Sequence, residues 1–114
     1  AAQRGIAPHP HGGSTNLLLA HDPTFWDGYI LQKHADIPLM LCGHTHGGQI
    51  GVEVGPIRWG LSRFVYDRWA GLYTETPEGQ PAQHLYVNRG IGTVGPPVRI
   101  GIKPEITLIT LVRA

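Results

Sequence analysis

Two short apolar segments, each followed by histidine, constrain the fold of this chain more than any other feature. The first covers residues 16–20 (NLLLA) and is followed by His21, and the second covers residues 39–42 (LMLC) and leads through Gly43 to His44. Continuous apolar runs of this length indicate strands that are covered on both faces of a sheet. The sequence therefore predicts two buried strands with histidine at their carboxyl ends.

A helix is expected between these two segments. Asp22 suits the N-cap position, where a short polar side chain accepts hydrogen bonds from the first N–H groups, and Pro23 suits the first helical position. One apolar helical stripe follows, made of Phe25, Trp26, Tyr29 and Ile30. The helix should end near His34, because Pro38 disfavours helical geometry at the residue before it. Such a strand–helix–strand unit predicts an α/β fold with parallel strands, whose carboxyl ends share the edge where α/β sheets place active sites.

The rest of the chain shows a weaker pattern. Residues 1–15 are rich in Ala, Gly, Pro and His and indicate a loop or the end of a preceding element, so the domain portion is residues 16–114. Further strands are expected at residues 49–54, 84–88 and 106–112. Residues 56–72 mix aromatic and basic side chains without a clean period. The Gly- and Pro-rich residues 89–104 indicate a long ordered loop beside a site.

Composition argues against several classes of protein. The formal net charge is +1 and the nine Lys and Arg residues are scattered, which argues against a nucleic-acid partner. The single cysteine excludes an internal disulfide framework and gives no sign of an oxidising compartment. No apolar run approaches the roughly 20 residues that span a bilayer, and the first residues lack the apolar core of a signal peptide. The expected location is the cytoplasm or a membrane surface.

His44 and His46 form a His-x-His pair flanked by glycine. In an extended segment the two imidazoles lie on the same side, about 6.5 Å apart along the chain. Imidazole binds Zn, Fe, Ni and Mn to differing degrees. Gly43 and the Gly47–Gly48 pair permit backbone turns that a Cβ atom would forbid, which aims both ligands into one cavity. His21 would add a third nitrogen from the neighbouring strand end, so the sequence predicts a metal site made of three histidines.

At this point four segments resemble a known family. Residues 43–50 (GHTHGGQI) resemble the last sequence motif of calcineurin-like metallophosphoesterases, Gly-His-x-His. Residues 19–23 (LAHDP) are similar to the preceding motif, an apolar strand that ends in His. Residues 85–92 (LYVNRGIG) and 104–108 (PEITL) resemble the bacterial branch that carries GHTHGGQ. That branch includes phosphodiesterases similar to UDP-2,3-diacylglucosamine pyrophosphohydrolases.

The resemblance implies a fold, a metal centre and a reaction. The family fold is a four-layer α/β/β/α sandwich that holds two divalent transition metal ions, which here would be Mn, Fe, Zn or Ni. The resemblance implies that His21 and His44 bind one ion and that His46 binds the other. A hydroxide between two such metals attacks the phosphorus of a phosphodiester or pyrophosphate, while the metals stabilise the transferring phosphoryl group from both sides.

The chain departs from the family in three motifs. Asp-x-His, Gly-Asp-x-x-Asp and Gly-Asn-His, which precede the motifs found here in the family, do not occur in the sequence. The resemblance therefore implies the C-terminal part of a metallophosphoesterase domain without its N-terminal half, the bridging carboxylate or a catalytic histidine. We expect such a chain to bind metal weakly and not to turn over alone.

Asn88 and Arg89 are the predicted substrate-binding residues. They lie where a strand ends and a glycine-rich loop begins, and an Arg there would bind phosphate through two hydrogen bonds, with a surface Arg as the alternative. The expected substrate is a phosphate-ester small molecule or a lipid-linked nucleotide. A basic and aromatic cluster could also contact an anionic membrane surface, although packing over the core is the favoured interpretation. The cluster consists of Arg58, Trp59, Arg63, Phe64, Arg68 and Trp69.

Two other interpretations use the same histidines. A non-catalytic zinc-binding module would bind its ion through Cys42, His44 and His46 and would not need His21. A cupin-like barrel also uses His-x-His, but it expects a Glu about four residues after the second His, where this chain has Ile50. The predicted helix also fits an all-β barrel poorly.

Overall fold

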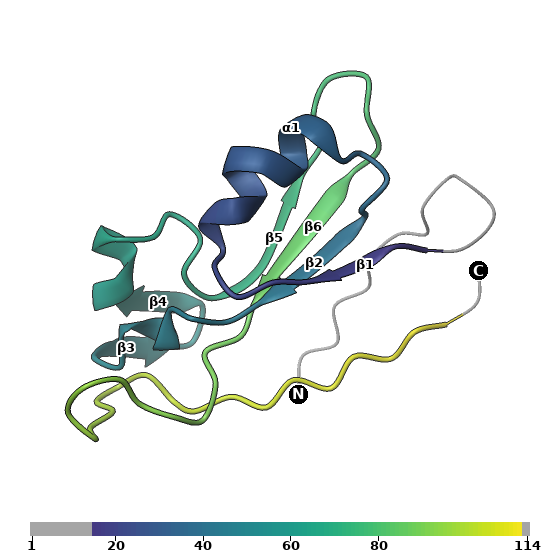
Figure 1. Cartoon of the computed structure of the whole chain (residues 1–114). Helices are drawn as coiled ribbons and strands as arrows, with labels where there is room; N and C mark the ends of the chain where they lie inside the picture. Colours follow the sequence, from purple (N-terminus) through teal and green to yellow (C-terminus); the bar gives the residue numbers. More distant parts are fainter. Residues whose placement is uncertain (1–14, 113–114) are drawn as a thin grey trace.

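The computed structural model describes residues 15–112, which form a mixed α/β fold on one four-stranded sheet (Figure 1). The strands are β1 (Leu17–Leu19), β2 (Leu39–Cys42), β5 (Gly71–Glu75) and β6 (Gln83–Val87), in the order β1-β2-β6-β5. β1, β2 and β6 run parallel, whereas β5 pairs antiparallel with β6. The predicted α/β fold with parallel strands is confirmed. The loop expected at residues 1–15 lies, except for its last residue, outside the described residues.

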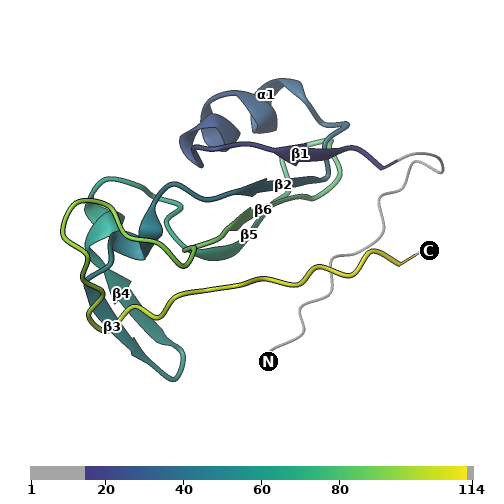
Figure 2. The same cartoon turned by 60° about the horizontal axis from the view of Figure 1, so that its bottom comes forward.

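A helix of residues 24–33 lies over one face of the sheet, as Figure 2 shows from the side. It contains a wide turn, η1 (Trp26–Ile30), followed by α1 (Leu31–Lys33). The predicted N-cap is confirmed, because the Asp22 carboxylate accepts hydrogen bonds from the backbone N–H and the hydroxyl of Thr24, each at 2.8 Å. The helix is thus fixed at the point where the chain leaves β1.

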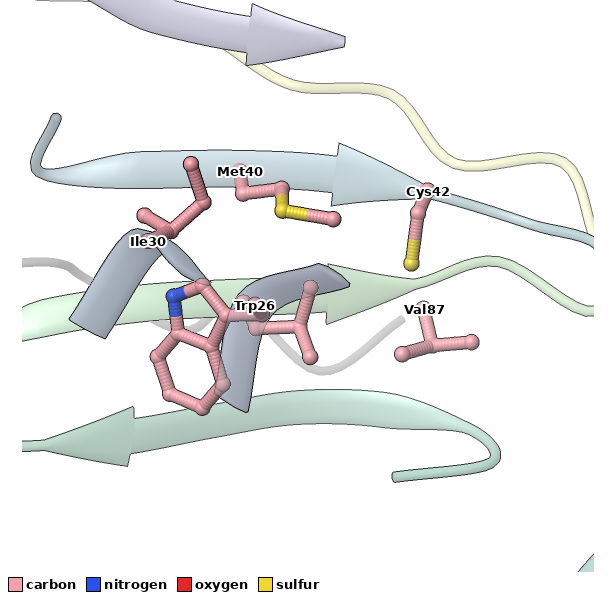
Figure 3. Close-up of a cluster of buried hydrophobic side chains, with 6 residues drawn as sticks. Trp26, Ile30, Met40, Cys42 and Val87 are labelled. Atoms are coloured by element: carbon pink, nitrogen blue, oxygen red, sulfur yellow. The ribbon is translucent and has the colours of Figure 1, made fainter. Parts of the chain in front are cut away.

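The helix packs on the sheet through a cluster of buried side chains (Figure 3). The members are Trp26, Ile30, Met40, Cys42, Leu85 and Val87. Alternate residues of β2 and β6 contribute to it, as expected when successive side chains of a strand point to opposite faces. The predicted apolar stripe is only half buried, because Phe25 and Tyr29 stack on each other at the surface with ring centroids 5.2 Å apart. Only the side of the helix that faces the sheet is buried, and residues spaced four apart, here Trp26 and Ile30, lie on that side.

A small hairpin lies beyond one end of the sheet (Figure 1). It consists of β3 (Gly51–Val54) and β4 (Ile57–Gly60), followed by a single turn, η3 (Leu61–Phe64). The strand expected at residues 49–54 is confirmed in β3. β4 falls in the part of the sequence that showed no clean period, and β5 begins at its end. Both strands are short, and their pattern is set by pairing with β3 and β6.

The strand expected at residues 106–112 is wrong for the described part of the chain. This segment is extended but has no sheet partner there, and it runs on the side of the sheet opposite the helix (Figure 2). Ile106, Leu108, Leu111 and Val112 are exposed. An apolar alternation predicts which side chains favour burial, but a strand also needs a neighbour for its backbone hydrogen bonds. None of the helices within residues 15–112 is long and apolar enough to cross a membrane.

Two matched leucine substitutions test this packing. Leu85 is 0 % exposed in the core cluster, whereas Leu108 is 92 % exposed. Leu85→Ala is expected to lower the free energy of unfolding by about 2–5 kcal/mol, because it leaves a cavity in a closely packed core. Leu108→Ala should change it by less than about 0.5 kcal/mol. Urea denaturation of both variants measures the difference, and equal losses would show that Leu108 is covered by a neighbour.

Candidate metal centre

The parallel sheet brings three chain segments to one edge. The hydrogen-bond ladder continues past the strand ends, because Gly43 N–H donates to the His21 carbonyl at 3.3 Å and Asn88 N–H donates to the Cys42 carbonyl at 2.8 Å. The residues that follow β1, β2 and β6 therefore begin side by side. This is the edge where open α/β sheets place their sites.

His21 and His44 meet at this edge. Their ring centroids are 4.4 Å apart and their planes are tilted by 52°. Both residues are exposed. His46 does not join them: its Nδ1 lies 3.4 Å from the carbonyl oxygen of Gly92. Within residues 15–112 no three His, Cys, Asp or Glu side chains lie close enough together to hold a metal ion. The two adjacent imidazoles fit as part of a ligand set and do not complete one.

The turn after β2 has an unusual backbone. His44, His46 and Gln49 have φ values of 68°, 50° and 58°, in the left-handed region that favours glycine. Gly43, which was expected to make a turn that a Cβ would forbid, does not have a positive φ. The histidines themselves adopt the strained conformation. Non-glycine residues in this region cost of order 1 kcal/mol each and cluster at functional sites.

Packing around Thr45 and Gly48 holds this strained turn in place. The buried Thr45 hydroxyl donates to the carbonyl oxygen of Trp69 at 2.7 Å and accepts from Gly47 N–H at 3.3 Å. Gly48, with φ of 74°, packs so closely against η3 that a Cβ there would lie 2.4 Å from the backbone nitrogen of Ser62. A side chain at this position would therefore push η3 away from the turn.

The glycine-rich loop that follows β6 packs on the same turn, as the sequence predicted. Buried Gln49 donates from its side-chain amide to the carbonyl oxygens of Pro96 and Val98, at 3.3 and 3.0 Å, and accepts from Val94 N–H. Three peptide groups of the loop thus bind one side chain of the GHTHGGQ segment. Gln49 belongs to the GHTHGGQ segment, but no local sequence pattern indicated this role.

Arg99 makes a second connection between loop and turn. Its guanidinium donates to the carbonyl oxygens of Gly92 at 2.6 Å, Arg89 at 2.9 Å and His46 at 3.3 Å. It therefore links the end of β6 to the second histidine of the pair. Nothing in its sequence surroundings singled out Arg99, and only the three-dimensional approach of the loop to the turn reveals it.

Asn88 and Arg89 both bind other parts of the protein. The Asn88 amide donates to the Thr107 hydroxyl at 2.7 Å, and its oxygen accepts from Gly90 N–H at 2.6 Å. Arg89 Nε donates to Glu105 at 2.7 Å, and its Nη1 pairs with Glu53. The Arg89 side chain is only 13 % exposed, so it is neither a surface residue nor directed freely toward solvent. Contact of either residue with substrate stays a prediction.

Glu105 is the acceptor at the centre of this network, with its side chain 12 % exposed. Burial alone would raise the pKa of Glu105, but hydrogen bonds from Tyr86, Arg89 and Thr107 outweigh it, and the pKa lies below its usual value. Burial, together with the hydrogen bond to Glu105, raises the pKa of Tyr86. The network therefore holds a carboxylate that is charged in the folded state.

The stability contribution of Glu105 should depend on pH in a defined direction. Because its pKa is lowered by folding, the contribution is complete above the usual Glu pKa and is lost as the pH falls through the lowered value. Glu105→Gln is expected to cost about 1–3 kcal/mol of unfolding free energy at neutral pH, since it weakens hydrogen bonds to a charged group.

Urea denaturation between about pH 7 and pH 3 measures this difference, which should shrink as the carboxylate protonates. Glu78→Gln, in the exposed turn between β5 and β6, is the matched control and should change stability little at any pH. A difference for Glu105→Gln that stays constant over this range would contradict the assignment.

Cys42 belongs to the core rather than to the site. Its side chain lies beside Val87 under the helix (Figure 3), and burial, with the nearby charge of Asp22, raises its pKa to about 12. Zinc binds the thiolate form of cysteine, so this environment disfavours the zinc-binding module of Cys42, His44 and His46. The parallel sheet with its covering helix contradicts the cupin-like barrel.

Tyr66 also lies at the site, although no sequence pattern indicated it. Its hydroxyl oxygen is 2.7 Å from His44 Nε2. The two rings meet edge to face, with centroids 5.5 Å apart and planes at 82°. Tyr66 follows η3, the turn that packs against Gly48.

Comparison with known proteins extends the resemblance beyond short motifs. The chain is 38 % identical to the uncharacterized metallophosphoesterase YkuE of Bacillus subtilis over 97 residues, 84 % of this chain and 30 % of that protein. It is 33 % identical to the phosphodiesterase YaeI of Escherichia coli over 117 residues, 98 % of this chain and 38 % of that protein. A bovine transmembrane protein with a metallophosphoesterase domain is 36 % identical over 111 residues, 22 % of its length.

No family model and no solved structure matches the chain significantly. The chain spans about a third of the length of the first two relatives, 30 % of YkuE and 38 % of YaeI. Over most of its length, this chain is therefore homologous to metallophosphoesterases, of which it covers one portion.

Proposed function

We propose that this chain forms part of a metal-dependent phosphoesterase that hydrolyses a phosphodiester or pyrophosphate. The observation that supports this most strongly is the meeting of His21 and His44 at the carboxyl edge of the parallel sheet, in a chain homologous to metallophosphoesterases. His21 and His44 would hold one divalent transition metal ion and His46 a second. The ions would supply a bound hydroxide and stabilise charge on the phosphoryl group.

The residues of this chain have distinct tasks in the proposal. His21, on the strand end after β1, and His44, on the strained turn after β2, provide imidazole nitrogens from neighbouring strands. Arg99 and Gln49 fix the position of that turn relative to the loop after β6. The remaining ligands would come from polypeptide outside this chain, within a four-layer α/β/β/α sandwich. The chain covers 30–38 % of its first two relatives, which is consistent with such an arrangement.

The proposed substrate is a phosphate-ester small molecule or a lipid-linked nucleotide. YaeI of Escherichia coli, to which the chain is similar, is a phosphodiesterase by name. We assign this chain to the bacterial branch that carries GHTHGGQ, on the motif at residues 43–49. A peripheral membrane contact is proposed as well, through Arg63 and Phe64 of the basic and aromatic cluster, which are both exposed. Two other arginines of the cluster form ion pairs within the protein. Arg68 pairs with Glu75 at 2.7 Å, and Arg58 pairs with Glu53 at 3.1 Å.

Metal binding distinguishes this proposal from the zinc-binding module. His21→Ala and His44→Ala are each expected to weaken metal binding at least tenfold. Even the loss of a residue that only hydrogen-bonds to a metal ligand commonly lowers metal affinity by that factor. Cys42→Ala should leave metal binding unchanged. Equilibrium dialysis against Zn²⁺ or Mn²⁺, followed by elemental analysis, measures the bound ion. His34→Ala, which removes a histidine from the end of the helix, is the control. Loss of metal in Cys42→Ala with retention in His21→Ala would favour the zinc-binding module.

Hydrolysis tests the reaction itself. The 114-residue chain is expected not to turn over bis(p-nitrophenyl) phosphate, because His21, His44 and His46 lack a bridging carboxylate. A chain extended at its N-terminus by the corresponding part of a relative such as YkuE should hydrolyse the diester in a metal-dependent reaction, and His44→Ala should abolish it. Turnover by the 114-residue chain at a normal enzymatic rate would contradict this part of the proposal.

A further inference from the structure

We infer that Tyr66 is a positioning residue for the metal centre: its hydroxyl engages Nε2 of His44 and orients the imidazole, so that Nδ1 is the nitrogen left to bind an ion. The inference rests on the proposed function and adds to it a residue outside the recognised motifs. Tyr66 lies 22 positions after His44 in the sequence, in a segment without a clean period.

The contact between Tyr66 and His44 is specific in two ways. The separation of 2.7 Å between the phenol oxygen and Nε2 is that of a well-formed hydrogen bond. The edge-to-face arrangement of the rings, with centroids 5.5 Å apart, restricts how far the imidazole can rotate without losing contact. His44 also contacts His21 at 4.4 Å between centroids. The imidazole is therefore held between two rings and one hydroxyl.

The hydrogen bond decides which nitrogen faces an ion. A neutral imidazole has one N–H and one lone pair, and only the nitrogen with the lone pair can bind metal. Because the Tyr66 hydroxyl occupies Nε2, the free nitrogen of His44 is Nδ1. Nδ1 has a lone pair only when Nε2 has the proton, so Nε2–H donates to the phenol oxygen in the binding-competent tautomer. Hydrogen bonds of this kind to the second nitrogen commonly orient ligating histidines.

Tyr66 is itself attached to the turn that contains His44. Its backbone N–H donates to the Ser62 carbonyl at 2.8 Å, which fixes Tyr66 to η3. At the start of η3, Leu61 N–H donates to the Ile50 carbonyl at 3.1 Å, and Ser62 packs against Gly48. The hydroxyl and the imidazole are thus connected through a short, closely packed path. The hydrogen-bond partner of His44, Tyr66, is therefore held in place by η3.

Nuclear magnetic resonance of histidine ring nitrogens tests the inference on the whole chain as Zn²⁺ is added. Long-range ¹H–¹⁵N correlation should show His44 bound to the ion through Nδ1, with the proton on Nε2. Tyr66→Phe keeps the ring and removes the hydroxyl, and it should give a mixture of Nδ1-bound and Nε2-bound forms. Tyr29→Phe is the matched control and should leave the signature unchanged, because the Tyr29 ring stacks on Phe25 instead of His44. Binding through Nε2 in the unmodified chain, or no change in Tyr66→Phe, would overturn the inference.

Zn²⁺ affinity provides a second measurement. Tyr66→Phe is expected to weaken binding about 10- to 100-fold, and Tyr66→Gln, whose amide oxygen can accept from Nε2–H, should restore part of it. If His44→Ala removes Zn²⁺ binding and Tyr66→Phe does not weaken it, the inference fails and the proposed function stands. If His44→Ala leaves Zn²⁺ binding intact, the proposed function fails, and the inference, which rests on it, fails with it.

Discussion

β2 lies between two parallel neighbours, β1 and β6, and is hydrogen-bonded to both. Parallel strands start at one edge and end at the other, so three separate parts of the chain arrive together where these strands end. His21 follows β1, His44 follows β2 and Arg89 follows β6. The helix of residues 24–33 and its buried Trp26 and Ile30 hold the sheet from one side. The sheet thus brings the backbone of these three residues to one edge.

The segment after β2 is where the fold concentrates its strain. Left-handed φ values at His44, His46 and Gln49 are unfavourable for residues with a side chain, and the surrounding contacts must compensate. Thr45, Gln49 and Arg99 do so by binding main-chain groups of Trp69, the loop after β6 and His46. Each of these contacts joins the turn to a residue more than 20 positions further along the chain. The histidine positions therefore depend on segments from the second half of the sequence, although the histidines lie in the first.

The parts of the structure that could be predicted are those set by local signals. The apolar runs of β1 and β2, the Asp22 N-cap and the histidines at the strand ends follow from composition over a few residues. β4 and β5 could not be predicted, because their strand character comes from pairing with β3 and β6. Tyr66 and Arg99 could not be found either, since each becomes relevant through a contact across more than 20 positions.

The same limit explains the segment at residues 106–112. Its apolar alternation indicated a strand, yet a backbone ladder requires a neighbour, and none is present in the described part of the chain. Glu105 and Thr107, at the start of this segment, bind Arg89 and Asn88 instead. These polar contacts anchor the segment at one end and leave its apolar side chains exposed. Asn88 and Arg89 were predicted to face substrate, and their observed partners show a structural task that residue type alone does not indicate.

The pairing of β2 with β6 joins parts of the chain that are far apart in sequence. Leu39 pairs with His84 and Cys42 with Val87, so the central strand gains its second neighbour only after the hairpin, η3 and β5 have been looped out between them. Closing so long a loop costs entropy before the pairing repays it, and folds dominated by such distant contacts form slowly. On the ribosome, β1, the helix and β2 would emerge well before β6. The edge with His21 and His44 would therefore be completed only after β6 has joined β2.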